Sequence, residues 1–176
     1  MTLLIGLDPG LRHTGWGVVD ACGPDLRFVA CGVIHGLLDG ELAGRLGSIY
    51  HGLAEVIRVW APAEAAVEET VVNRNPLSSL KLGHARGVVL LAASHAGLTV
   101  AEYGSMQVKK AVTGTGHAGK DQVAAMVQAM LPGAGEPRAD AADALAVAIC
   151  HAHVRTSRGR IAAALARDRS AAARAP

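Results

Sequence analysis

The sequence predicts an α/β fold, in which a mixed sheet carries helices on its faces. Three observations support this prediction. The chain opens with three strand-like segments, it then alternates between helix-spaced and strand-like segments, and two of the strand-like segments are continuous apolar runs that end in a carboxylate. With 176 residues, the chain is long enough for one domain with a substantial core.

The first strand is expected at residues 3–7, a continuous apolar run that ends at Asp8 because a Pro-Gly pair follows. A run without polar alternation is typical of a strand that is buried on both faces of a sheet. After a glycine-rich turn, residues 16–20 and 26–34 predict two further strands, which would complete an antiparallel meander.

Residues 42–60 carry apolar side chains at helical spacing, and Pro62 ends this helix. A second short buried strand follows at 63–67 and ends at Glu68. A polar loop is expected at 71–76. The remaining elements are expected as a helix at 78–95, a strand at 98–103, a helix at 105–112, a loop at 114–119, and helices at 121–131 and 139–153.

Charge is unevenly distributed along the chain, although the formal net charge is only +2. Residues from 151 onward contain six arginines and one aspartate, which predicts a basic, disordered tail at 155–176 after a single domain at 1–154. The three cysteines form no CxxC pair, which argues against a zinc site and is typical of a reducing cytosol. No apolar run approaches membrane-spanning length, so we expect a cytoplasmic protein without a membrane partner.

Four carboxylates are candidates for one acidic site. Asp8 and Glu68 each end a buried strand, and they lie side by side if the two strands are neighbours. Asp140 and Asp143 stand three residues apart on one face of the last helix. Each has a structural alternative, because Asp8 suits a turn before Pro-Gly and acids in a first helical turn favour the helix dipole. Asp143, however, lies between alanines on a helix that is apolar nearly all round, with no Lys or Arg three or four residues later.

Carboxylates without evident basic partners point to hard divalent cations, since oxygen-only ligation suits Mg²⁺ or Mn²⁺ rather than zinc. Two such ions about 3.5–4 Å apart can hold both the attacking and the leaving oxygen of a phosphodiester. Without cations, some of the four crowded carboxylates would stay protonated. The pattern therefore predicts metal-dependent hydrolysis of a phosphodiester.

Four longer motifs occur in uninterrupted order between Leu3 and His153. They are LIGLDPGLRHTGWGVV, AVEE, SLKLGHARGV and RADAADALAVAICHAH. Together they resemble the RuvC family of bacterial Holliday-junction resolvases. The resemblance implies a ribonuclease-H-like fold, a mixed five-stranded sheet flanked by helices. It also implies a homodimer with two active sites, each of which nicks one strand of a four-way DNA junction in recombination and repair.

By position, the acidic tetrad of the family falls on Asp8, Glu68, Asp140 and Asp143. In AVEE the family pattern points to Glu68 and leaves Glu69 as its neighbour, which alternation along a strand supports, because the two must point to opposite faces. The resemblance further implies two Mg²⁺ ions per active site, for which Mn²⁺ substitutes. It also implies the branch-migration motor proteins RuvA and RuvB as partners, and a place at the bacterial nucleoid.

The resemblance places the DNA contacts in the loop after Glu68 and on basic residues, which would neutralise phosphates without reading bases. The expected contacts are Val71, Arg74, Asn75, Lys81, Lys109, Lys110 and Lys120. Some members of the family carry a base-stacking aromatic where this chain has Val71, so neither stacking nor a cleavage preference is carried over. Lys81 has a solvated helix charge as its alternative. By resemblance, the helix at 78–95 supplies the dimer interface, and ordinary core packing is the alternative.

Other functions remain as alternatives. Residues 114–120 nearly spell a P-loop, but Asp121 stands where Ser or Thr would bind Mg²⁺, and no strand leads directly into the loop. The turn after Asp8 resembles the phosphate loop of sugar kinases and actin, although such phosphotransferases need two such domains. An RNA-processing nuclease and a non-catalytic junction-binding protein are the other rivals.

Overall fold

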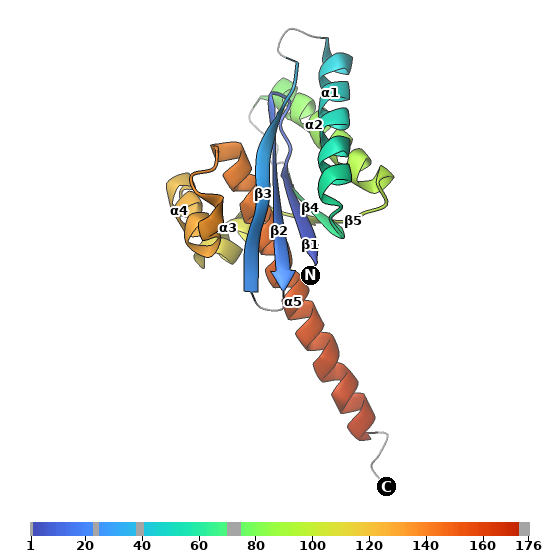
Figure 1. Ribbon diagram of the computed structural model, residues 1–176, viewed down its shortest axis with the longest axis vertical. Helices are drawn as coiled ribbons and strands as arrows, with labels where there is room; N and C mark the ends of the chain where they lie inside the picture. Colours follow the sequence, from blue (N-terminus) through green and yellow to red (C-terminus); the bar gives the residue numbers. More distant parts are fainter. Residues whose placement is uncertain (1, 23–24, 38–40, 70–74, 173–176) are drawn as a thin grey trace.

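The computed structural model describes residues 2–22, 25–37, 41–69 and 75–172, with side chains up to residue 166. A five-stranded mixed sheet in the order β3-β2-β1-β4-β5 forms its centre, with helices on both faces (Figure 1). The strands are β1 (Leu3–Asp8), β2 (His13–Cys22), β3 (Asp25–His35), β4 (Glu64–Glu68) and β5 (Thr99–Tyr103). The helices are α1 (Leu42–Trp60), α2 (Pro76–His95), α3 (Ser105–Thr113), α4 (Lys120–Met130), the short 3₁₀ helix η1 (Pro132–Ala134) and α5 (Ala139–Ala172). The predicted α/β class is confirmed.

The sheet joins two kinds of pairing at its central strand. β1 pairs antiparallel with β2, which pairs antiparallel with β3, whereas β4 runs parallel to β1 and β5 parallel to β4. In this register Leu7 lies opposite Val67, so the next residues, Asp8 and Glu68, leave neighbouring strands at the same edge. The expectation that these two carboxylates end adjacent strands is confirmed.

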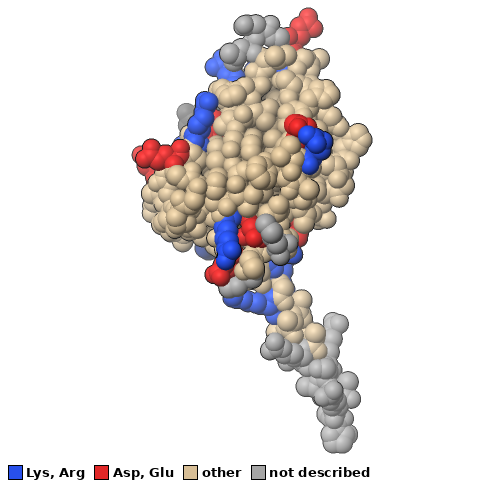
Figure 2. All heavy atoms as spheres, viewed as in Figure 1, with Lys and Arg blue, Asp and Glu red and all other residues tan. Residues whose placement is uncertain are grey.

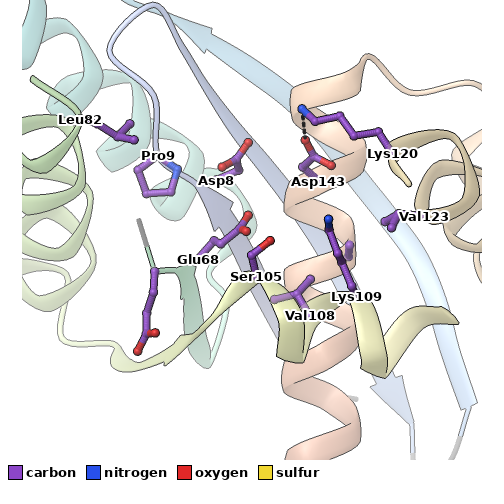
Figure 3. A pocket seen from close by; sticks show the side chains of 12 residues that line it. Asp8, Pro9, Glu68, Leu82, Ser105, Val108, Lys109, Lys120, Val123 and Asp143 are labelled. Atoms are coloured by element: carbon purple, nitrogen blue, oxygen red, sulfur yellow. Dashed lines mark ion pairs between the residues drawn. The ribbon is translucent and has the colours of Figure 1, made fainter. Parts of the chain in front are cut away.

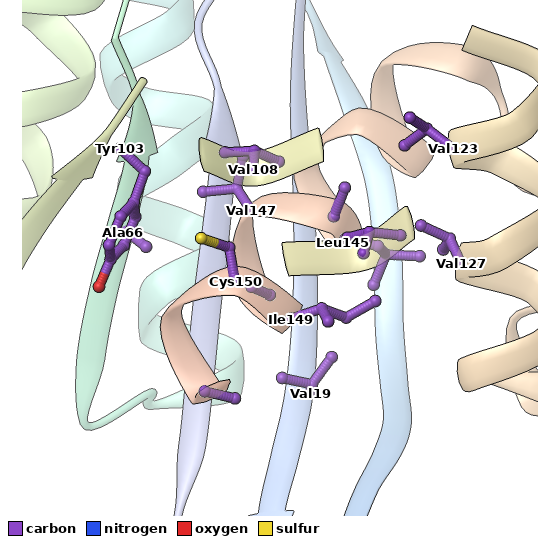
Figure 4. Close-up of a cluster of buried hydrophobic side chains, with 14 of the residues drawn as sticks. Val19, Ala66, Tyr103, Val108, Val123, Val127, Leu145, Val147, Ile149 and Cys150 are labelled. Atoms are coloured by element: carbon purple, nitrogen blue, oxygen red, sulfur yellow. The ribbon is translucent and has the colours of Figure 1, made fainter. Parts of the chain in front are cut away.

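Two hydrophobic cores cover the faces of the sheet. One core packs α1 and α2 against Ile5 and Leu7. The other packs α3, α4 and α5 against Leu4, and part of it is shown in Figure 4. All three of these β1 side chains are fully buried, as expected for a strand covered on both faces. The space-filling view shows a largely uncharged surface on which Lys, Arg, Asp and Glu are scattered (Figure 2).

Helix α5 lies directly on the backbone of β1 and β2, because the sheet presents glycines beneath it. A Cβ atom at Gly6 would stand 2.1 Å from the carbonyl oxygen of Ala144, and one at Gly15 would stand 1.9 Å from that of Asp140. At Gly17 the nearest atom would be a methyl carbon of Leu145, at 2.7 Å. The glycines therefore set how closely the helix, and the acids at its start, approach the sheet.

Helix α5 differs most from the sequence prediction, because it continues to Ala172 instead of ending near residue 153. The expected disordered tail at 155–176 is thus helical over its described part. Alanine and arginine are strong helix formers, and extending a helix costs far less than starting one. The domain boundary at 154 stays a prediction.

Helix α2 also begins earlier than predicted, at Pro76, which suits the first helical turn because its missing N–H needs no partner there. Asn75 caps this helix, and its side-chain oxygen accepts hydrogen bonds from the N–H groups of Leu77 and Ser78 at 3.0 and 3.3 Å. Among the helices that the structure describes, none is long and apolar enough to cross a membrane.

We expect Gly6→Ala to destabilise the protein by about 2–3 kcal/mol, since the added methyl group would collide with the backbone of α5. Chemical denaturation measures the loss. Gly47→Ala, in α1, provides the control because nothing lies within 4 Å of its added Cβ. That change should leave stability unaltered or raise it by roughly 0.5–1 kcal/mol. Equal stability of the two variants would contradict the close contact.

Candidate active site

A cavity of about 280 Å³ opens at the edge of the sheet where β1 and β4 end (Figure 3). Its lining combines carboxylates from β1, β4 and α5 with lysines from α3 and α4. The lining residues are Asp8, Pro9, Glu68, Glu69, Leu82, Ser105, Val108, Lys109, Lys120, Val123, Asp143 and Ala146.

Three of the four predicted carboxylates line this cavity, and their side chains face a common space in Figure 3. Asp8 and Glu68 come from the ends of neighbouring strands, and Asp143 comes from the start of α5. Asp140, one turn earlier on α5, is not among the lining residues. Its charge nevertheless helps to raise the pKa of Asp8 and of Asp143, so it lies near enough to act on both.

The crowding of these carboxylates opposes their ionisation. Burial, followed by the charges of Glu68, Asp143 and Asp140, raises the pKa of Asp8 from 3.8 to about 7. Burial is also the main cause that raises the pKa of Glu68 and of Asp143. The site therefore resists carrying its full negative charge at neutral pH unless a positive charge joins it.

Two lysines supply part of that positive charge. The ammonium group of Lys120 lies 3.7 Å from a carboxylate oxygen of Asp143, and it lowers the pKa values of Asp8, Glu68 and Asp143. Lys109 lowers the pKa of Glu68 and of Asp143 in the same way. The sequence prediction that these carboxylates lack basic partners was therefore wrong. Local spacing along α5 could not reveal a partner that a separate helix supplies.

The predicted DNA contacts fall into four groups. Lys109 and Lys120 line the cavity, whereas Lys81 and Lys110 are exposed on α2 and α3 outside its lining. Asn75 caps α2. Val71 and Arg74 lie outside the described residues.

Sequence reasoning missed Ser105, the first residue of α3. Its hydroxyl group donates a hydrogen bond to the carboxylate of Glu68, and this bond lowers the pKa that burial raises. A signal for it existed, because Ser105 follows the strand that ends at Tyr103, the register partner of Glu68. Recognising that signal required knowing that β4 and β5 pair.

The chemistry of the donors fits a hard divalent cation, since carboxylate oxygens are the ligands that Mg²⁺ and Mn²⁺ prefer. A cation would also relieve the repulsion that raises the pKa of Asp8. Within residues 2–22, 25–37, 41–69 and 75–172, no three His, Cys, Asp or Glu side chains are already arranged to hold one ion. In the described conformation, Asp143 has the Lys120 ammonium as its neighbour.

The fold and the site together define a nuclease of the ribonuclease-H-like class, with carboxylates from adjoining strand ends beside lysines. The family model described as "Crossover junction endodeoxyribonuclease RuvC" matches residues 4–151. The chain therefore belongs to the RuvC family of crossover junction endodeoxyribonucleases, whose members depend on divalent metal ions.

Similar proteins support this assignment over nearly the whole chain. The RuvC of Rhodospirillum rubrum is 57% identical over 164 residues, which cover 93% of this chain and 96% of that protein. The RuvC of Gluconacetobacter diazotrophicus is 57% identical over 163 residues, 93% of this chain and 97% of that protein. The structure of Thermus thermophilus RuvC in complex with a Holliday junction substrate matches with a TM-score of 0.83 and 38% identity, covering 89% of this chain and 96% of that one.

A more distant structure shares the fold alone. The yeast mitochondrial Holliday junction resolvase Ydc2 matches with a TM-score of 0.63 and 10% identity, over 88% of this chain and 80% of that one. The overall fold is thus shared where only 10% of the residues are identical.

The metal-free protein should lose stability as the pH rises. The folded pKa of Asp8, about 7, lies above its ordinary 3.8, so the proton on Asp8 stabilises the folded state below pH 3.8 and this contribution is lost as the pH rises through 7. Asp8→Asn removes the charge and should stabilise the metal-free protein at about pH 8 by roughly 2–4 kcal/mol. The gain should shrink towards about pH 5.

Urea denaturation in EDTA across this pH range measures the effect. Asp25→Asn, the same chemical change at an exposed position of β3, is the control. A stabilisation by Asp8→Asn that does not vary with pH would contradict the raised pKa.

Proposed function

We propose that this protein is a structure-selective endonuclease that resolves four-way DNA junctions by paired symmetric nicks, in recombination and repair. The observation that carries this proposal is the meeting of Asp8, Glu68 and Asp143 in one cavity, on a chain whose family model spans residues 4–151. The Holliday junction complex of the Thermus thermophilus relative supports the choice of substrate.

The four carboxylates Asp8, Glu68, Asp140 and Asp143 would hold two Mg²⁺ ions, or Mn²⁺ in their place. When bound, the ions supply an activated water and stabilise the departing 3′-oxygen of the cleaved strand. Asp8 is the central ligand, because the charges of the other three carboxylates all act on it. Pro9, next to it in the cavity lining, limits the side-chain bulk near the phosphate.

Lys120 has two successive roles in this proposal. Without DNA it partly neutralises Asp143, and its side chain is 82% exposed, so it can swing away at little cost. With Asp143 engaged in metal binding, Lys120 would be free to contact a phosphate of the junction. Lys109, half-buried in the same cavity, contacts the phosphate backbone beside it.

The remaining DNA contacts are proposed along the surface around this cavity. Exposed Lys81 and Lys110 would neutralise phosphates further out, and the capping residue Asn75 would donate from its amide nitrogen. Arg74 and Val71 complete the set. None of these groups is assigned a base to read, so we propose recognition of the shape of the junction.

Helix α2 is the proposed homodimer interface. It exposes Leu77, Leu80 and Leu91 by 69%, 58% and 59%, an unusual amount of apolar surface for one helix. A dimer places two active sites on one junction, as paired nicks require. RuvA and RuvB are the proposed motor partners, and a chromosomal junction as substrate would place the protein at the nucleoid.

A synthetic four-way junction should be nicked in the presence of Mg²⁺, and a linear duplex of the same sequence should not. Asp8→Asn should keep junction binding and lose cleavage by at least about 10³-fold, because it removes a central ligand and leaves the phosphate contacts intact. Gel electrophoresis of labelled strands reports both binding and cleavage.

The rival functions give different results in the same assay. Equal cutting of junction and duplex would refute junction selectivity. Absence of cutting with either Mg²⁺ or Mn²⁺ would favour a junction-binding protein, and a preference for structured RNA would favour an RNA-processing nuclease. Turnover of ATP without DNA would favour a phosphotransferase.

Leu80→Asp should convert the proposed dimer into a monomer, because a charge cannot be buried unpaired at an apolar interface. Light scattering after gel filtration measures the mass. Ile161→Asp, at an equally exposed apolar position on α5, is the control and should leave the mass unchanged. A dimeric Leu80→Asp/Leu91→Asp variant would place the interface elsewhere.

A further inference from the structure

A series of hydrogen bonds, buried at one end and exposed at the other, links α5 to the sheet away from the cavity. The hydroxyl group of Tyr103 lies 2.7 Å from Nδ1 of His151, and Nε2 of His151 lies 3.1 Å from a carboxylate oxygen of Glu64. Arg155 donates to the other oxygen of Glu64 at 2.8 Å. Tyr103 and His151 are only 4% and 6% exposed, and Tyr103 belongs to the hydrophobic core on the α5 face (Figure 4).

The direction of each hydrogen bond follows from the chemistry of its partners. Burial lowers the pKa of His151, so its imidazole is neutral at neutral pH, with one donor and one acceptor nitrogen. A carboxylate only accepts, so Nε2–H donates to Glu64 and Nδ1 accepts the hydroxyl hydrogen of Tyr103. These hydrogen bonds therefore have one consistent arrangement of donors and acceptors. They fix the distances between Tyr103, His151 and Glu64.

Stability alone does not account for such a series of hydrogen bonds. Polar and charged groups in a core cost desolvation energy, and apolar side chains of similar volume often stabilise a protein as well or better. Apolar packing, however, specifies the axial position of an alanine-rich helix less sharply than a hydrogen bond, which tolerates only a few tenths of an ångström. These hydrogen bonds therefore specify the axial position of α5.

Tyr103 connects that position to the active site. It is the register partner of Glu68, and its carbonyl oxygen accepts the N–H of Glu69 at 2.9 Å. His151 lies on the helix that carries Asp143, about 12 Å further along its axis at about 1.5 Å per residue. The Tyr103–His151 hydrogen bond thus ties the strand end at Glu68 to the helix of Asp143.

We propose that Tyr103 and His151 are positioning residues for the metal-binding carboxylates. Through their hydrogen bond, continued by Glu64 to Arg155, they hold α5 at one axial position against β4 and β5, and so hold Asp143 at one distance from Glu68. The contacts with glycines set how closely α5 approaches β1 and β2. The hydrogen bonds set the position of α5 along β4 and β5. The inference rests on the proposed metal site.

Tyr103→Phe tests the proposal, because it keeps the ring and removes only the hydroxyl group. Calorimetric titration with Mn²⁺ in the absence of DNA should show affinity weakened roughly three- to tenfold, below the 10–100-fold typical of groups that directly orient a ligand. The Mg²⁺ concentration for half-maximal junction cleavage should rise by a similar factor. Junction binding in EDTA should stay the same.

Two further variants separate positioning from general stability. His151→Asn keeps an acceptor near the place of Nδ1 and should weaken Mn²⁺ binding less than His151→Ala. Ile49→Val, in the core on the opposite face, should lower the melting temperature without touching these hydrogen bonds. It should leave Mn²⁺ affinity unchanged.

The outcomes are distinguishable. Unchanged Mn²⁺ affinity in Tyr103→Phe, with normal binding by the unmodified protein, overturns the positioning role and leaves the nuclease proposal standing. An equal loss of Mn²⁺ affinity in Ile49→Val also overturns the positioning role, because the affinity would then depend on overall stability. If the unmodified protein binds no Mn²⁺ and nicks no junction, the proposed function fails, and the positioning role fails with it.

Discussion

Direct backbone contact between α5 and the glycines of β1 and β2 is the constraint on which the acidic site depends. A helix at ordinary distance from a sheet would hold its first-turn acids too far from the strand ends. Here the carbonyl oxygens of Asp140 and Ala144 occupy space that a side chain at Gly15 or Gly6 would need. The small residues of α5 make the same contact possible from the helix side. The site thus depends on the absence of side chains at Gly6 and Gly15 as much as on its charged side chains.

The electrostatics of the site oppose folding and favour cation binding. Burial and mutual repulsion raise the pKa of Asp8 to about 7, so the metal-free protein carries an unfavourable charge cluster at neutral pH. The ion pair between Lys120 and Asp143 offsets part of this repulsion, but an exposed lysine is a weak substitute for a divalent ion. A bound cation would relieve this repulsion, and that relief would contribute to the free energy of cation binding. Active sites commonly hold such perturbed carboxylates for this reason.

Much of this arrangement could be predicted from sequence patterns, and the exceptions share a cause. Residues 3–8 and the segment ending at Glu68 are continuous apolar runs, so both strands and their carboxylates were predictable. The axial packing of α5, the Lys120 partner of Asp143 and the Tyr103–His151 bond were not, because each joins residues far apart in the chain. The extent of α5 was misjudged for a different reason: a polar, arginine-rich segment has no apolar face to signal a helix, yet its propensity sustains one. Val71 and Arg74 lie outside the described residues.

The order of elements along the chain has a consequence for biosynthesis. β1 and β4, which carry Asp8 and Glu68, precede α5, and α5 follows all five strands. A ribosome releases these strands before the helix that carries Asp143, since chains emerge from their N-terminus. At that stage the nascent chain has Asp8 and Glu68 of the acidic site. It still lacks α5, which carries Asp140 and Asp143 and packs on one face of the sheet. On the proposed site, DNA cutting would therefore have to wait until synthesis has passed residue 143 and α5 has docked on its glycines.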